Sequence, residues 1–436
     1  MVTTSNTSST RNHTDVRSES NSRSRKYSAV PCKMRTRSSK GWHNMARTNI
    51  PLDPTRTGLE AKRLALDLQG LIVGQDEPIE QIVNFYQAYL TGMTLPGRPI
   101  ASFLFLGPTG SGKTRIVEAT AECLVKSPRA VIKIDCGEFQ HSHEIAKLIG
   151  SPPGYLGHRE THALLTQEVL NQYHTETVKM SFVLFDEIEK ASDALWNLLL
   201  GILDKGTLTL GDNRRVDFSR AMIFMTSNLG ASETNALVNP KLGFKACRPG
   251  ELAASGAVDQ ELDSKIVRSG LEAARKKFTP EFINRIDRIV TFRPLGSGQL
   301  QRILDIELEM VQRRIFRAAP ERSFIIEVTG PAKDLLLSEG TDMKYGARHL
   351  KRAIERLLVQ PICSLIATGQ AREGDSIRVD WNRASDHLTF TREAEGLPFW
   401  AMTDSLGRAK FARALPTSRS ISFEAARAQA RFSRTT

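Results

Sequence analysis

The stretch Phe103-Leu104-Phe105-Leu106-Gly107-Pro108-Thr109-Gly110-Ser111-Gly112-Lys113-Thr114 decides the fold. Its last eight residues match the pattern G-x-x-x-x-G-K-[ST], a glycine-rich loop that surrounds the phosphates of a nucleotide. The apolar residues 103–106 predict a buried strand that leads into the loop, with a helix following it. In that setting the loop N–H groups and the helix N-terminus face the phosphates. We therefore predict a P-loop nucleotide-binding domain.

The loop residues have distinct expected roles. Lys113 is expected to reach the outer phosphates, and the Thr114 hydroxyl can ligate Mg²⁺. The glycines let the backbone curl around the phosphate oxygens. We expect all eight loop residues to bind ATP: Gly107, Pro108, Thr109, Gly110, Ser111, Gly112, Lys113 and Thr114.

A second apolar run, residues 182–185, ends in Asp186 and Glu187. A strand of a parallel sheet delivers its last residues to the sheet edge where ligands bind. There Asp186 can hold Mg²⁺, and Glu187 can orient and deprotonate the attacking water. The sequence thus predicts ATP and Mg²⁺ as ligands and an ATPase rather than a binding module alone.

Strands and helices alternate from about Pro51 onward, as in an α/β domain with a mostly parallel sheet. The candidate strands are the short apolar runs 103–106, 131–135, 182–185 and 221–226. Such runs are expected where helices cover both faces of the sheet. We assign residues 51–294 to this P-loop domain.

The pattern changes after Pro294. Long charged helices are predicted at 297–317 and 347–368, and short strands at 324–329, 375–381 and 386–391. This mixture predicts a smaller α+β lid domain over residues 295–394. Within the first domain, Gly211-Asp212-Asn213 predicts the tip of a hairpin over residues 207–218.

The net charge of +12 is concentrated in two tails. Residues 1–50 carry +8 and residues 401–436 carry +5, so the 350 residues between them sum to −1. Both tails are poor in apolar residues, so we expect a disordered basic leader over residues 1–50 and a flexible basic tail over residues 395–436. This distribution does not favour nucleic acid as a partner of the folded body.

Apolar residues make up 40% of the 436, enough to fill two or three domain cores, but no run approaches the roughly 20 needed to span a bilayer. We therefore expect no membrane association. The five cysteines are widely spaced, without a C-x-x-C pair, which is typical of reduced thiols. A cytoplasmic location is expected. An organelle transit peptide in the Arg-rich leader and a translation start at Met45 are alternatives that the sequence leaves open.

Four ordered segments resemble the Clp family of AAA+ protein unfoldases. They are Phe185-Asp186-Glu187-Ile188-Glu189-Lys190-Ala191, Met225-Thr226-Ser227-Asn228, Phe278-Thr279-Pro280-Glu281-Phe282-Ile283-Asn284-Arg285-Ile286-Asp287 and Tyr345-Gly346-Ala347-Arg348. The resemblance covers about residues 55–390 and implies one ATPase module like the second module of larger Clp proteins. We recognise no folded N-terminal domain or first ring module.

The resemblance implies roles for four further residues. Asn228 is expected as sensor 1, which helps to place the lytic water, and Arg348 as the sensor 2 arginine of the lid. Arg285 is expected as an arginine finger that reaches the ATP of a neighbouring subunit, so the active species is expected to be a homo-oligomer, by analogy a hexamer. Val73, in Ile72-Val73-Gly74-Gln75, is expected to pack on the adenine.

Two loops bear on the substrate. Ser151-Pro152-Pro153-Gly154-Tyr155-Leu156-Gly157 resembles the pore loop with which such rings grip polypeptide, so Tyr155 is expected to contact an unfolded or aggregated chain. Leu242-Gly243-Phe244, in an extended segment at about 232–268, resembles a tripeptide that docks a peptidase; local packing is the alternative. The predicted hairpin at 207–218 either lines the pore or simply connects two elements.

Two histidine pairs resemble metal sites without meeting their requirements. His158 and His162 lack the Glu that must follow the first His of the metalloprotease pattern, because Arg159 stands there. His141 and His143 have no third ligand nearby in sequence and are expected to face solvent. We assign no metal to either pair.

The leading hypothesis is an ATP-driven unfoldase or disaggregase that threads polypeptide through a ring. An AAA+ remodeller of nucleic acid or nucleoprotein is one alternative, since the phosphate chemistry suits it equally. A nucleotide switch without turnover is another. A polypeptide-stimulated ATPase that ignores DNA separates the first two, and Glu187→Gln separates the third.

Overall fold

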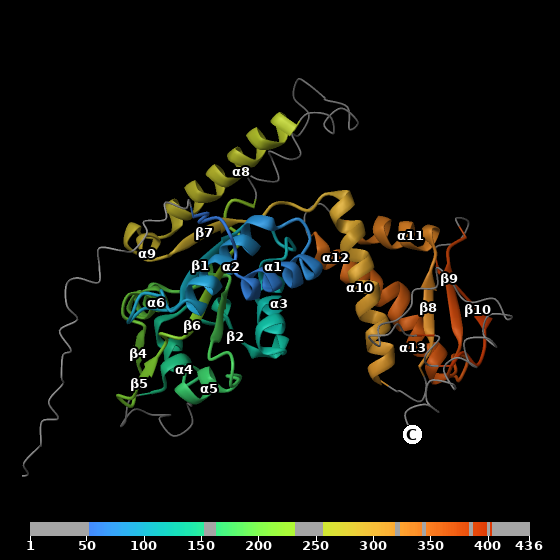
Figure 1. Ribbon diagram of the computed structural model, residues 1–436, viewed down its shortest axis with the longest axis horizontal. Coiled ribbons are helices and arrows are strands. Elements are labelled where there is room, and N and C mark those ends of the chain that lie inside the picture. Colours follow the sequence, from blue (N-terminus) through green and yellow to red (C-terminus); the bar gives the residue numbers. More distant parts are fainter. Residues whose placement is uncertain are drawn as a thin grey trace, which may run out of the picture. The chain divides into compact units, whose positions relative to one another are not determined.

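The computed structural model describes residues 52–151, 163–231, 256–318, 323–341, 346–382, 387–398 and 402, with side chains in the helix from Gly256 described from Ser264 onward (Figure 1). All contacts discussed below lie in the compact unit Thr57–Thr436. Every helix in these ranges is too short or too polar to span a bilayer.

A parallel five-stranded sheet forms the centre of the P-loop domain, with strand order β2-β3-β6-β1-β7. Its strands are β1 (Ala101–Leu106), β2 (Val131–Asp135), β3 (Ser181–Asp186), β6 (Ala221–Ser227) and β7 (Arg288–Thr291). The first four confirm the sequence prediction within two residues at either end. The edge strand β7 was missed.

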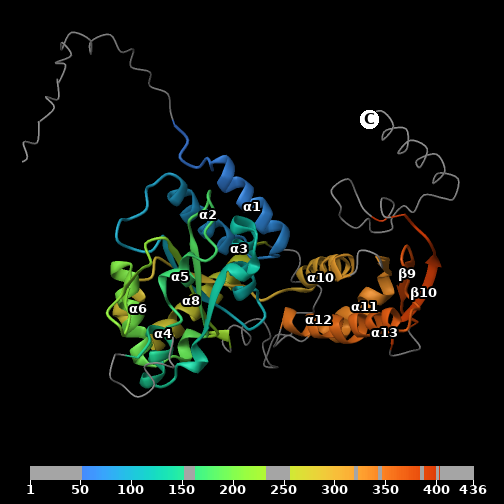
Figure 2. The same ribbon diagram turned by 90° about the horizontal axis from the view of Figure 1, so that it is seen from below.

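Two hydrophobic cores cover the two faces of this sheet. Alternate residues of β1 point to opposite sides, so Phe103 and Phe105 belong to one core while Leu104 and Leu106 belong to the other. The phenylalanine side packs against α1 (Leu59–Leu71), α2 (Asp76–Leu90) and α3 (Lys113–Val125). Helices on both faces are visible in Figures 1 and 2. The α/β fold class is confirmed.

The leucine side of the sheet packs against a different set of helices. They are α4 (Ala146–Ile149), α5 (Gln167–Asn171), α6 (Asp193–Lys205), α8 (Gly256–Lys277) and α9 (Pro280–Asn284). Helix α8 corrects one prediction, because residues 256–268 of the segment expected to be extended are helical. The hairpin is confirmed as β4 (Thr207–Thr209) and β5 (Arg215–Asp217), which pair antiparallel.

The C-terminal part combines long helices with a three-stranded sheet of order β10-β9-β8. Its elements are α10 (Ser297–Ala318), β8 (Ile325–Val328), α11 (Gly330–Gly340), α12 (Ala347–Ile354), α13 (Gln360–Ala367), β9 (Ser376–Asp380) and β10 (Thr389–Ala394). The predicted helix and strand types are confirmed, with β10 starting three residues later than expected. Helix α11 was missed.

The predicted helix 347–368 contains a wider turn. Residues Glu355–Val359 form a π-helical turn between α12 and α13, which ends two residues before Pro361. Proline has no N–H group and cannot complete the regular i to i−4 hydrogen-bond pattern. The helix therefore widens into a π turn ahead of the proline and continues beyond it.

Candidate nucleotide-binding site

Backbone conformation shapes the phosphate loop between β1 and α3. Gly107, Gly110 and Gly112 have φ angles of 139°, 79° and 103°, a region that side chains other than glycine rarely adopt. A Cβ at Gly107 would lie 2.7 Å from the backbone oxygen of Phe292. The glycine at position 107 is therefore required both by its backbone angle and by the close approach of the neighbouring chain.

The Lys113 ammonium group lies inside the loop. Its Nζ donates to the backbone oxygens of Gly107 at 2.6 Å and Pro108 at 2.9 Å, and to Asn228 Oδ1 at 3.0 Å. Burial lowers the pKa of Lys113 to about 8, an effect that the nearby Glu189 carboxylate opposes. Phosphate charge in the loop would restore a favourable environment for the ammonium form.

Gln75 ties the segment 72–75 to the loop. Its buried Nε2 donates to the backbone oxygens of Ser111 at 3.2 Å and Arg293 at 2.9 Å, and its Oε1 accepts from the Arg293 N–H at 3.2 Å. The loop is thereby connected to the chain that leaves β7. The same segment brings Val73 to the wall of the cavity described below.

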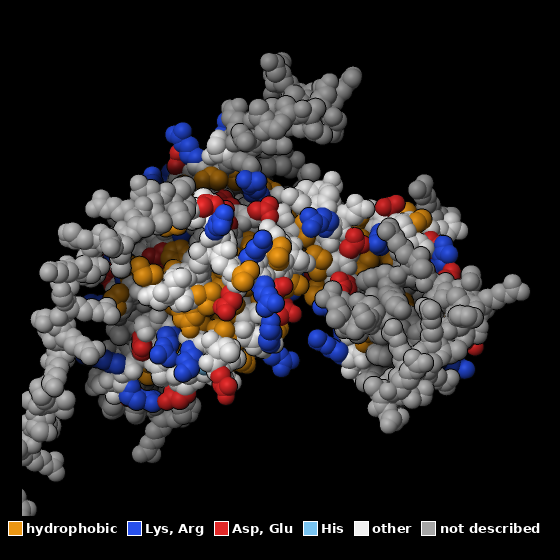
Figure 3. All heavy atoms as spheres, in the orientation of Figure 1, with side chains coloured by type: hydrophobic (Ala, Val, Ile, Leu, Met, Phe, Trp, Pro, Cys, Tyr) orange, Lys and Arg blue, Asp and Glu red, His pale blue; other side chains and the backbone are white. Residues whose placement is uncertain are grey.

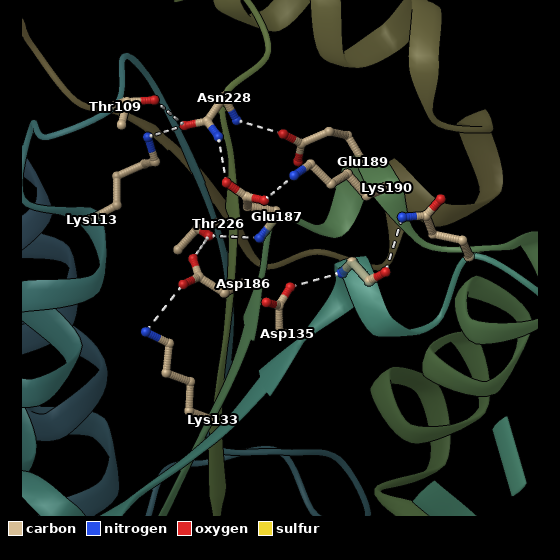
Figure 4. A network of polar contacts seen from close by, with 12 residues as sticks. Thr109, Lys113, Lys133, Asp135, Asp186, Glu187, Glu189, Lys190, Thr226 and Asn228 are labelled. Carbon is tan, nitrogen blue, oxygen red and sulfur yellow. Dashed lines mark hydrogen bonds and ion pairs between the residues drawn. The ribbon is translucent and has the colours of Figure 1, made fainter. Parts of the chain in front are cut away.

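Asp186 and Glu187 leave the end of β3 next to the loop (Figure 4). The Asp186 carboxylate accepts a hydrogen bond from the Thr226 hydroxyl and pairs with Lys133 Nζ at 3.3 Å. Thr226 belongs to β6 and Lys133 to β2, so the two strands that flank β3 hold this carboxylate from either side.

Glu187 has a left-handed backbone conformation, with φ of 58°. Its N–H donates to Thr226 Oγ1 at 3.1 Å. Its carboxylate accepts from Asn228 Nδ2 at 3.3 Å and pairs with Lys190 Nζ at 2.5 Å. Strained backbone of this kind persists only where surrounding contacts hold it, and it is concentrated at functional sites.

Asn228 connects the loop to the acidic residues, as the dashed lines in Figure 4 show. Its Oδ1 accepts from Lys113 and from Thr109 Oγ1 at 3.3 Å, while its Nδ2 donates to Glu187. Its backbone N–H donates to Glu189 Oε1 at 3.0 Å. One amide thus contacts both the residue expected to bind phosphate and the residue expected to activate water.

A cavity of about 280 Å³ lies between the loop, the β-strand ends and the lid helices. Eleven of the predicted site residues line it: Val73, Thr109, Gly110, Ser111, Gly112, Lys113, Thr114, Asp186, Glu187, Asn228 and Arg348. Gly107 and Pro108, the first two residues of the loop, are not among the lining residues, and their carbonyl groups accept hydrogen bonds from Lys113.

The lid reaches this cavity through the start of α12. The Ala347 N–H donates to the backbone oxygen of Gly110 at 3.3 Å. Gly346, with φ of 51°, approaches the same loop so closely that a Cβ there would lie 3.0 Å from that oxygen. This contact sets Arg348, which is exposed, beside the loop.

Arg285 is not among the residues that line the cavity. Its guanidinium pairs with Asp204 Oδ2 at 3.0 Å and with Glu281 Oε1 at 2.9 Å. It therefore lies with α6 and α9, apart from the other predicted residues. A residue that acts on a neighbouring subunit's nucleotide needs such a place outside its own cavity.

Tyr155 and the two histidines at 158 and 162 lie outside the described residues, as does the tripeptide at 242–244. His141 and His143 are exposed, as expected.

Sequence reasoning missed several charged residues around the cavity. Lys133 and Lys190 pair with Asp186 and Glu187, and Lys351 pairs with Glu307 at 2.7 Å in the cavity wall. Lys133 is the single charged residue within the apolar run 131–134. Its side chain is half exposed on the edge strand β2, so this charge alone does not predict the pair with Asp186.

Two protein-family models match the chain in succession. Residues 98–289 match an AAA domain of the Cdc48 subfamily. Residues 295–379 match the C-terminal, D2-small domain of ClpB protein. The chain belongs to the Clp family of AAA+ ATPases.

Relatives in this Clp family support the assignment. Chaperone protein ClpB of Rhizobium meliloti (strain 1021) is 38% identical over 352 residues, covering 80% of this chain and 36% of the relative. ClpB of Clostridium tetani is 37% identical over 335 residues, covering 76% and 35%. The chain spans about a third of the length of these curated relatives.

Solved structures of Hsp104 share the fold of this Clp-family chain. A closed state with ATPγS and FITC-casein has a TM-score of 0.60 and 29% identity, covering 76% of this chain and 52% of that one. The Hsp104–ADP complex of S. cerevisiae has a TM-score of 0.61 and 28% identity, covering 77% and 52%.

Proposed function

We propose that this chain is a Clp-type ATPase subunit that hydrolyses ATP in the cavity and uses the energy to unfold polypeptide. One observation carries the ATPase proposal: four side chains from the loop helix and two strand ends meet at one cavity, namely Lys113, Asp186, Glu187 and Asn228. Phosphate binding, metal binding and water activation need those chemical groups in one place.

The residues present fit a magnesium nucleotide. Mg²⁺ prefers oxygen ligands and is held in P-loop proteins by a loop hydroxyl and a strand-end carboxylate. Thr114 and the half-buried Asp186 line the same cavity and supply those oxygens. When bound, Mg²⁺ would neutralise charge on the phosphate oxygens. The Asp186 carboxylate is oriented for that role by Thr226 and balanced in charge by Lys133.

Glu187 is the proton acceptor in this proposal. Its carboxylate is fixed by Asn228 and Lys190, so its direction is set before the nucleotide arrives. As the water oxygen attacks the terminal phosphorus, its proton passes to Glu187 and the bond to the leaving ADP oxygen breaks. Lys113 and Arg348 offer positive charge to the phosphoryl oxygens on which negative charge develops.

The proposal includes a ring of identical subunits. Arg285, held outside its own cavity by Asp204 and Glu281, is proposed to complete the site of the next subunit. A head-to-tail contact of this kind closes into a ring, for which we propose six subunits. We propose the division into a P-loop domain at 51–294 and a lid at 295–394 as the units that move against each other.

Polypeptide is the proposed substrate, gripped by Tyr155. The relatives named as ClpB chaperones and the structures of Hsp104 with casein support this choice. Positive and negative side chains are interspersed over the described face in Figure 3, unlike the basic stripe that a polyanion favours. Docking of a peptidase at 242–244 and the cytoplasmic location stay predictions.

ATP turnover by the purified full chain tests the proposal. We expect an unfolded protein such as casein to raise the ATPase rate, and we expect DNA to leave it unchanged. Glu187→Gln should reduce turnover by about 10²-fold or more while ATP still binds. Stimulation by DNA alone would favour a nucleic-acid remodeller. A negligible ATPase rate in the full chain that Glu187→Gln leaves unchanged would favour a nucleotide switch.

A further inference from the structure

Trp196 lies in the first turn of α6, outside the cavity wall, and contacts two functional regions at once. Its indole N–H donates to the backbone oxygen of Ile188 at 3.1 Å. Its ring meets Phe278 edge-on, with centroids 5.4 Å apart at 69°, and meets Phe282 at 6.4 Å. Ile188 directly follows Glu187, while Phe282 precedes Arg285 by three residues.

The contact with Ile188 supports the backbone at Glu187. The left-handed conformation of Glu187 needs surrounding contacts to hold it. The Ile188 oxygen is held by two donors, Trp196 Nε1 and the Ala191 N–H at 3.2 Å. Because the Ile188 side chain is fully buried, this turn is fixed to the core on one side and to the indole on the other.

The contact with the phenylalanines supports Arg285. Helix α9 has only five residues, too few to be stable without packing. Its anchor is the fully buried Phe282, whose ring also packs on Phe278 at 5.4 Å. The Arg285 N–H donates to the Phe282 oxygen at 3.2 Å. The packing of the Phe282 ring therefore fixes the backbone position from which the Arg285 side chain extends.

Helix α6 also contacts Arg285 directly, at its other end. Asp204 in its last turn pairs with the guanidinium at 3.0 Å. Figure 1 shows α6 and α9 beside each other, in agreement with these contacts. Helix α6 therefore has two contact points. Trp196 contacts the turn after Glu187 and, through Phe282, the backbone of Arg285. Asp204 contacts the Arg285 guanidinium.

We propose that Trp196 is a positioning residue that sets Glu187 in its own cavity and Arg285 for the neighbouring subunit. The proposal rests on the proposed function, in which Arg285 acts on the next nucleotide. A displacement of the backbone at Ile188 would move the indole, and the indole would then displace the Phe282 ring that it contacts. Water activation in one subunit and charge stabilisation in the next are thereby set by a single side chain.

Trp196→Phe tests the hydrogen bond while retaining an aromatic ring. We expect kcat for ATP to fall about fivefold, corresponding to ~1 kcal/mol, with KM unchanged. Trp381→Phe, the same replacement beyond β9 in the lid, is the matched control and should retain the wild-type kcat. Unchanged kcat in Trp196→Phe, or a rise in KM alone, would overturn the proposal.

Mixed rings separate the two halves of the proposal. Glu187→Gln subunits supply Arg285 but cannot hydrolyse ATP, while Arg285→Ala subunits have the reverse defect, so a mixture should regain activity. Adding Trp196→Phe to either partner should lower the regained rate. Loss from one partner only would overturn the double role. No regained activity at all would instead contradict the ring, and the kcat of Trp196→Phe alone would still decide the Glu187 half.

Intrinsic fluorescence gives a readout with Trp196 intact. Replacing Trp42, Trp381 and Trp400 by Phe leaves Trp196 as the single tryptophan of the chain. Its ring is partly exposed and lies under Lys277 Nζ at 5.4 Å, so its emission is sensitive to small displacements. Addition of ATPγS should change this emission. Emission that is identical with and without ATPγS would overturn the proposal.

Discussion

The cavity edge and the Arg285 region serve the same proposed reaction but differ in how their polar groups are satisfied. At the cavity edge, Asn228 forms hydrogen bonds with both Lys113 and Glu187, and all three residues line the same cavity. Arg285 pairs with two surface carboxylates and faces a different part of the molecule. From this difference we propose that the first region binds nucleotide within one chain, whereas the second acquires its role only beside another chain.

The largest expected effect is on the Arg285 side. Arg285→Ala should lower kcat about 10³-fold, because an arginine that stabilises phosphoryl charge contributes at least this much. The Kd for ATP of the isolated subunit should stay the same, since Arg285 lies outside the cavity. Steady-state ATPase assays and equilibrium binding measure the two quantities.

Arg268→Ala is the matched control for this variant, since Arg268 is an exposed arginine paired within α8. A Kd for ATP that rises as far as kcat falls would show that Arg285 acts within its own chain and would remove the contrast between the two regions.

Lys113→Ala should weaken ATP binding about 100-fold, because two charge-assisted hydrogen bonds to phosphate are worth ~3 kcal/mol. Unlike Arg285→Ala, this change should act without a neighbour and should not be rescued in mixed rings. Calorimetry of ATP binding measures it, with the exposed Lys205→Ala as control. Rescue by a partner subunit would contradict a self-contained cavity.

Gly107→Ala should destabilise the P-loop domain by ~2 kcal/mol, because a side chain is forced into a disfavoured backbone region. The added Cβ also meets the Phe292 oxygen at 2.7 Å. The free energy of unfolding from urea titration measures the effect. Gly298→Ala in α10, where a Cβ meets open space, is the control. Equal stability of the two variants would refute this account of the loop.

The smallest effect concerns pH. Since burial lowers the pKa of Lys113 to about 8, the ammonium form is lost as pH rises through that value. Phosphate binds the ammonium form, so the affinity for ATP should fall above pH 8, approaching tenfold per pH unit. Calorimetry between pH 7 and about 9.5 measures the trend. Lys113→Arg should remove it, and an equal slope in both proteins would assign the titration to another group.

Much of the fold was predictable because its strands are buried on both faces. Strands β1, β3 and β6 lie inside the sheet and are continuous apolar runs. Strand β7 was missed because it has only four residues and starts with the exposed Arg288. So short a run carries too weak an apolar pattern to be distinguished from a loop.

The candidate site was predictable where one short segment carries a chemical role. The loop, the Asp186-Glu187 pair and Asn228 each belong to a short continuous sequence motif. The ion pairs of Lys133 and Lys190, and the indole bond of Trp196, were not predictable in this way. Those contacts depend on the turn that follows β3 and on strand order, which no local pattern encodes.

In the proposed function, the contact between Gly346 and the phosphate loop would let the lid act as a lever. The helical residues that follow, Ala347 to Ala367, continue through the π turn without a break and extend roughly 30 Å. A tilt of about ten degrees at the loop would therefore carry the far end through about 5 Å. Sub-ångström rearrangements around a departing phosphate would be amplified into strokes comparable to the rise of a residue or two in an extended polypeptide.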